Sequence, residues 1–105
     1  MKYTVQRTDT ADALLRKIVL YVAENFGRET ALKKLDELET SLLAPGDHPY
    51  LGTLPRYPVL RRQGYYTLIL DKNIVFYKVD EERKTVTVYA IVDHRQDYLS
   101  ILRGL

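Results

Sequence analysis

The chain has 105 residues, with 16 basic side chains, 14 acidic side chains and no cysteine. A chain of this length can bury a core without metals or cross-links. The lack of cysteine excludes a disulfide framework, zinc held by cysteine and a thiol nucleophile. Hydrophobic residues at 46% and charged residues at 29% indicate a globular chain rather than a disordered one. No repeat or linker divides it, so we expect one domain over residues 1–105.

Two further features of the composition limit the protein's location and chemistry. The longest apolar run, residues 18–23, is far too short to span a bilayer, and residues 1–7 lack the apolar stretch of a signal peptide. We therefore expect a cytoplasmic protein with no membrane partner. Tyrosine is unusually frequent, with nine residues against two phenylalanines and no tryptophan.

The first half of the chain is patterned as a strand followed by a helix. Polar and apolar residues alternate over residues 2–7, which predicts a half-buried strand. Thr8, Asp9 and Thr10 can cap the N-terminus of a helix, and apolar residues then recur with helical period. The helix should stop at Gly27, which can adopt the left-handed backbone conformation of a C-cap.

A second helix should begin near Arg28 and end at residues 44–46, where a proline and a glycine follow each other. One face of it is apolar, at Ala31, Leu35, Leu38 and Leu42. Because almost nothing joins the two helices, we expect an antiparallel hairpin.

The second half is patterned for strands. A loop rich in proline and glycine covers residues 47–63, and runs with strand character follow at 65–70, 74–79 and 85–92. The tail, residues 96–105, is predicted to form a short last turn of helix. The order is therefore β-α-α-β-β-β, which predicts an α+β fold in which the hairpin packs on one face of an antiparallel sheet.

The opposite face of this sheet should be open, with Tyr89 and Ile91 on it. Together with Leu99, Ile101 and Leu102 of the tail, Ile91 would then leave apolar surface that a partner segment could cover. The alternative is that the tail folds back onto the sheet.

One stretch of the chain combines arginine and tyrosine without any acid. Between Asp47 and Asp71 there is no carboxylate, whereas arginine and tyrosine are frequent. Arginine neutralises phosphate and tyrosine can stack on an unpaired base, so this composition suits nucleic acid. A solvated sheet edge is the alternative interpretation. The residues expected to bind RNA are Arg56, Arg61, Arg62 and Tyr66.

A second polar cluster, residues 93–98, directly follows the last strand. His94 can transfer protons near neutral pH, Arg95 can stabilise negative charge, and Tyr98 can donate a proton or stack. The alternative is that Arg95 only pairs with Asp93 or Asp97. No carboxylate accompanies a histidine at ligand spacing, and there is no glycine-rich phosphate loop, so we expect neither a metal nor a cofactor.

The C-terminal half resembles the RelE/ParE toxin superfamily of bacterial toxin–antitoxin modules, the plasmid-stabilisation type toxins. The specific parts are the strand FYKVD at residues 76–80 and the ending HRQDY at residues 94–98. The helix pair after a short first strand extends the resemblance over essentially the whole chain. It implies a small toxin that is neutralised by a cognate antitoxin and causes growth arrest when free.

The resemblance implies two possible activities. RelE-like members cut mRNA on the ribosome without metal, which is the activity that we expect here and which would inhibit translation. ParE-like members poison DNA gyrase without enzymatic activity, which is the alternative. For RNA cleavage, the catalytic residues would be Arg95 for the developing charge and His94 or Tyr98 for proton transfer. RelE-like ribonucleases usually carry basic residues on the strands that correspond to residues 65–70 and 74–79, and Lys78 is the only basic residue there. This difference leaves gyrase inhibition open. A degenerate domain that only binds an antitoxin is the third alternative.

Overall fold

The computed structural model describes residues 2–95 and 98–103. Two segments that we expected to belong to the tail, residues 96–97 and 104–105, lie outside this description. The elements follow the predicted order, with the short helix expected in the tail present as α4 and one further short helix, α3, added. They are β1 (Thr4–Arg7), α1 (Asp9–Phe26), α2 (Arg28–Asp47), α3 (Pro58–Arg62), β2 (Tyr66–Ile69), β3 (Asn73–Asp80), β4 (Thr85–Asp93) and α4 (Tyr98–Arg103).

The four strands form one sheet in the order β1-β4-β3-β2. The last three strands are antiparallel neighbours, as predicted. The fold class is as predicted, but the sheet as a whole is mixed rather than purely antiparallel, because β1 pairs with β4 in parallel, with Thr4 opposite Thr85 and Arg7 opposite Val88. The helical hairpin connects β1 to β2. This crossover returns the chain to the sheet so that β2 and β4 run in the same direction as β1.

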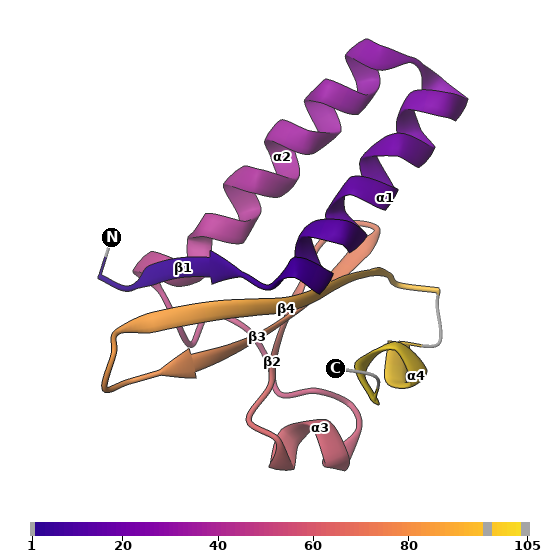
Figure 1. The fold of residues 1–105 in the computed structure, drawn as a ribbon. Coiled ribbons are helices and arrows are strands. Elements are labelled where there is room, and N and C mark those ends of the chain that lie inside the picture. The colour runs from indigo at the N-terminus through magenta and orange to yellow at the C-terminus, as the bar shows by residue number, and fades with distance from the viewer. Residues whose placement is uncertain (1, 96–97, 104–105) are drawn as a thin grey trace.

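The two long helices form the predicted hairpin (Figure 1). The side-chain oxygen of Thr8 accepts a hydrogen bond of 3.1 Å from the backbone N–H of Ala11, which caps α1. Gly27 ends α1 at φ +93°, in the region that glycine favours. The second helix runs through Pro45 to Asp47, a little past the predicted stop, because proline in a last turn removes only one hydrogen bond.

The main core lies between the hairpin and one face of the sheet. Ala11 and Leu15 of α1 and Leu38 and Leu42 of α2 are buried there. The sheet contributes Val75, Tyr77, Val86, Val88 and Ile91. The end of the hairpin extends beyond the sheet, so its tip has no layer beneath it (Figure 1).

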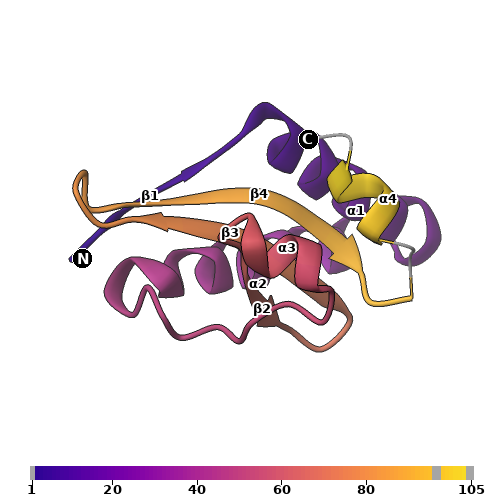
Figure 2. The same ribbon diagram turned by 90° about the horizontal axis from the view of Figure 1, so that it is seen from below.

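The other face of the sheet is partly covered, which corrects the prediction of an open face. Helices α3 and α4 lie under it, on the side away from the hairpin (Figures 1 and 2). Leu60 of α3 and Leu102 of α4 are 1% and 2% exposed and share a second core cluster with Phe76, Ala90 and Val92. The tail therefore folds back onto the sheet. Helix α3 was not predicted, because five residues are too few to show a helical period.

A β-bulge explains why Ile91 is not on the outer face. Phe76 pairs with Ala90 and Tyr77 pairs with Val88, so Tyr89 is an extra residue in β4. Alternation restarts after the bulge: Tyr89 and Ala90 both pack in the outer cluster, and Ile91 turns into the main core with 1% of its surface exposed. The prediction is wrong for Ile91 because it assumed unbroken alternation.

Within the part of the chain that the structure describes, no helix is long and apolar enough to cross a membrane.

Candidate functional site

The end of β4 carries an arginine–carboxylate fork. The Nε and Nη2 atoms of Arg95 donate hydrogen bonds of 3.1 and 3.2 Å to the two carboxylate oxygens of Asp93. The backbone N–H of Arg95 also donates to Asp93, at 2.8 Å. The Arg95 guanidinium lowers the pKa of the Asp93 carboxyl to about 2, mainly through the side-chain hydrogen bond. The pairing that was the alternative interpretation of Arg95 is therefore present.

His94 lies beside this fork at the surface, and its ring bonds the backbone of the preceding hairpin. Its Nδ1 lies 3.0 Å from the carbonyl oxygen of Lys72, and its backbone N–H donates to the same oxygen at 3.1 Å. A proton on Nδ1 satisfies that carbonyl and leaves Nε2 available as a base. Tyr98, the third residue of the predicted cluster, starts α4, and its side chain lies outside what the structure describes.

The predicted RNA-binding arginines lie at α3, under the outer face of the sheet. Arg61 is anchored by backbone carbonyls: its Nε donates to Pro55 at 2.6 Å and its Nη2 to Arg56 at 3.0 Å. The guanidinium carbon of Arg56 lies 5.8 Å from the ring centre of Tyr57. Arg62 is exposed at the end of the helix. The structure therefore brings three of the four predicted residues together.

Tyr66, the fourth, lies on the other side of the sheet. It packs against the main core and stacks on Tyr77, with ring centres 5.7 Å apart. Tyr50 contacts it edge-on at 5.4 Å. Its ring is thus engaged with other rings on the hairpin side.

One lysine on the outer face is held between two tyrosine rings. The Nζ of Lys78 lies 4.5 Å from the ring centre of Tyr65 and 5.0 Å from that of Tyr89, in cation–π geometry. Burial, and then the neighbouring Tyr89, raise the pKa of Tyr65. The sequence identified Lys78 as the basic residue of the strand, but the two rings around it follow from the bulge at Tyr89.

These groups do not converge on one point. Lys78 lies five residues along β3 from Asn73, which pairs with Asp93 at the end of β4. At about 3.3 Å per residue this separates Lys78 from His94 and Arg95 by roughly 17 Å along the sheet. The lysine and the histidine cannot act on the same phosphate at that distance. Among the described residues, no group of histidines and carboxylates could hold a metal ion.

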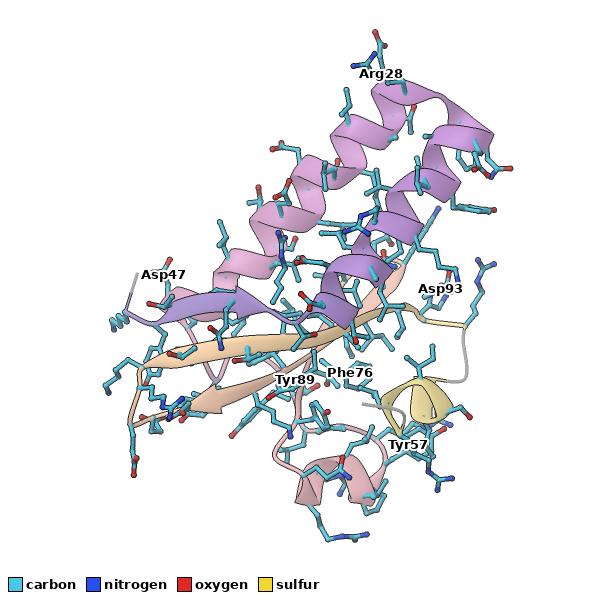
Figure 3. The ribbon with its side chains drawn as sticks, in the orientation of Figure 1. Arg28, Asp47, Tyr57, Phe76, Tyr89 and Asp93 are labelled. Carbon is cyan, nitrogen blue, oxygen red and sulfur yellow. The ribbon has the colours of Figure 1, made fainter. Side chains whose placement is uncertain are left out.

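Apolar side chains are exposed on the part of the hairpin that leads to its tip. Leu20, Tyr21 and Phe26 of α1 expose 55%, 61% and 65% of their surface, and Leu32 of α2 exposes 53%. Figure 3 places this tip, marked by Arg28, far from Tyr57 and Asp93. An apolar surface rimmed by charged residues is typical of a protein-binding site.

Comparison with known proteins agrees with this architecture. Solved structures with a similar fold include a chromosomal ParDE toxin–antitoxin system from P. aeruginosa, at 21% identity and a TM-score of 0.71, with 88% of this chain and 96% of that chain covered. A free mutant of the E. coli toxin RelE matches over both full lengths, at 18% identity and a TM-score of 0.64. The toxin–antitoxin complex RelBE from E. coli matches at 16% identity and a TM-score of 0.59, covering 90% and 99%. These likenesses show the fold.

No curated protein sequence matches the chain. A family model does match it, over residues 5–98: the ParE toxin of the type II toxin–antitoxin system parDE. This match contains the whole hairpin and strands β2, β3 and β4, and it begins at the second residue of β1 and ends at the first residue of α4. The chain therefore belongs to the ParE toxin family of type II toxin–antitoxin systems.

Proposed function

We propose that this toxin acts by binding a protein, with DNA gyrase as the target, rather than by cutting RNA. The observation that carries the proposal is the placement of the cations: Lys78 lies far from the polar cluster at the end of β4, and the arginine of that cluster is paired with a carboxylate. Metal-free RNA cleavage needs a base, an acid and a cation around one phosphate. Here Lys78 lies roughly 17 Å along the sheet from His94 and Arg95, and Arg95 is paired with Asp93.

The exposed hairpin tip supports binding to a protein. Phe26 and Leu32 lie on either side of the turn at Gly27 and are both more than half exposed. Burying two such side chains against a partner is worth about 1.5–3 kcal/mol each. This surface is formed by the two rigid helices, so little ordering is needed on binding.

A supercoiling assay with purified gyrase tests the proposal. The toxin should inhibit supercoiling, and Phe26→Ser with Leu32→Ser should weaken the inhibition at least tenfold. Leu43→Ser is the matched control, because Leu43 is 45% exposed on the same helix but away from the tip. The double variant His94→Ala, Arg95→Ala should inhibit like the parent. Undiminished supercoiling at saturating toxin would overturn the choice of target.

Ribosome-dependent mRNA cleavage is the second candidate, because His94 and Arg95 are exposed together at the end of β4. In this mechanism His94 Nε2 would take the proton of the ribose 2′-hydroxyl, whose oxygen would bond to the adjacent phosphorus as the bond from phosphorus to the 5′-oxygen of the next nucleotide breaks. Tyr98 would give that leaving oxygen a proton, and Arg95 would leave Asp93 to stabilise the charge on the phosphate. Arg61, Arg62 and Arg56 would hold the RNA backbone. Cleavage of translating mRNA that is abolished by Arg95→Ala would establish this candidate in place of the first.

A cognate antitoxin is the proposed partner in either case. The matched solved structures include toxin–antitoxin complexes, and the exposed tip offers apolar surface to a partner. Co-expression with the adjacent reading frame tests the pairing. A stable complex that restores growth is expected, and the absence of any complex would contradict it. Growth without arrest on expression of the toxin alone would instead favour a degenerate, binding-only domain.

A further inference from the structure

We propose that α3 and α4 form a binding surface for the backbone of double-stranded DNA. The surface consists of Arg56, Arg61 and Arg62 around α3 and Arg103 at the end of α4. The inference does not depend on the identity of the toxin's protein target. It starts from charge and from the way the two helices are brought together.

The fold joins two arginine-bearing segments that are far apart in sequence. Leu60 of α3 and Leu102 of α4 are buried in the same cluster beneath the sheet. Each is next to an arginine in sequence, Arg61 and Arg103, and both helices lie on the side away from the hairpin (Figure 2). The cluster therefore fixes these arginines on one side of the molecule.

No acid among the described residues neutralises this surface. Residues 48–70 and the described residues of α4 contain no carboxylate. None of the four arginines forms a salt bridge with a described residue, whereas Arg7, Arg83 and Arg95 each pair with a carboxylate. Because the whole chain carries only +2, four arginines on one surface leave the rest of the chain with a net negative charge. A concentrated positive surface of this kind attracts a polyanion.

The guanidinium groups are partly held in place before any ligand binds. Two backbone carbonyls fix the Nε and Nη2 of Arg61. A guanidinium has five N–H donors, so Arg61 keeps donors for phosphate. Arg56 lies over the ring of Tyr57. Fixed guanidinium groups lose less conformational entropy on binding phosphate than free ones.

The rings near this surface favour a duplex over a single strand. Binding of unpaired bases depends on aromatic faces that are free to stack. The ring of Tyr57 carries Arg56, and the rings of Tyr65 and Tyr89 share Lys78. Tyr65 is also only 4% exposed. Among the rings that the structure describes here, none is free to stack, and the surface offers mainly cations, which match the phosphate backbone of a duplex.

Fluorescence anisotropy with a labelled 20-base-pair DNA duplex, in the absence of gyrase, tests the proposal. Four phosphate contacts predict a slope of about −3.6 for the logarithm of the binding constant against the logarithm of the salt concentration. Arg62→Glu with Arg103→Glu should weaken binding at least tenfold. Circular dichroism checks that the variant is folded.

The control is Arg28→Glu, which makes the same kind of charge change at the exposed hairpin tip. Its binding should stay within about 1.5-fold of the parent, because charge far from the bound duplex is screened within about 10 Å at 0.1 M salt. If Arg28→Glu lowered the affinity for DNA as much per unit of charge, the effect would come from net charge alone and the proposed surface would be wrong. No binding at low salt would overturn it as well. Tenfold tighter binding to a single-stranded RNA of equal length would overturn the assignment to duplex DNA.

Discussion

The hydroxyl of Tyr77 accepts a hydrogen bond of 2.9 Å from the backbone N–H of Gly52, 25 residues earlier in the chain. This bond fixes the loop before α3 against the sheet. Thr53 continues the contact by exchanging two backbone hydrogen bonds of 2.8 Å with Thr67 on the edge strand β2. The loop thereby covers the free edge of β2 and limits pairing with another chain.

Gly52→Ala should destabilise the protein by about 1–3 kcal/mol, because a Cβ there would overlap the carbonyl oxygen of Thr67 and come within 2.8 Å of the Tyr77 hydroxyl. Urea unfolding measures the free energy change. Leu54→Ala, two residues away and 64% exposed, is the control and should change stability by no more than about 0.5 kcal/mol. Equal stability of Gly52→Ala and the parent would show that the loop does not pack as described.

Ile91→Ala should cost about 2–5 kcal/mol, because the bulge at Tyr89 turns Ile91 into the main core, where it is 1% exposed. Ile69→Ala makes the same change on β2, where the side chain is 68% exposed, and should have a small effect. Thermal or denaturant unfolding of the pair compares them directly. If Ile91→Ala were as mild as Ile69→Ala, strand β4 would have to alternate without the bulge.

The sequence predicts those elements that have a strong hydrophobic period or that end at a residue such as glycine. Gly27 separates two long apolar stripes, and the described helices meet there. The register change at Tyr89 could not be predicted, because a bulge depends on pairing between β3 and β4 rather than on the residues of β4 alone. The parallel pairing of β1 depends likewise on where the hairpin returns the chain.

The candidate site was predictable to a similar extent. The acid two residues before Arg95 indicated the fork with Asp93, which the structure contains. Sequence distance could not separate Tyr66 from Arg61 and Arg62, because neighbouring elements can lie on opposite faces of a sheet. The sequence also gave no reason to place Arg103 on the same side as α3, because that placement depends on the tail folding under the sheet.

Leu102→Ala should destabilise the protein by about 2–5 kcal/mol, because Leu102 is 2% exposed and packs with Leu60 and Phe76. The same change should increase amide hydrogen exchange in α4 and α3 together, since both helices lie on one cluster. Leu43→Ala, at a half-exposed position on α2, is the matched control. Unchanged exchange in α3 would mean that the two helices are not coupled.

The Asp93 carboxyl should titrate near pH 2, well below its ordinary pKa of 3.8, because Arg95 hydrogen bonds to its charged form. Since the folded-state pKa is lowered, the fork's contribution to stability is fully present above about pH 4 and is lost as the pH falls through about 2. The contribution is small because both side chains are at the surface. Carbon-detected NMR of the carboxyl measures the midpoint. Arg95→Gln should return it toward 3.8, whereas Arg83→Gln, which removes an arginine beside Asp80 instead, should leave it unchanged. A midpoint near 4 in the parent protein would show that the fork does not form in solution, and Arg95 would then be free to bind phosphate.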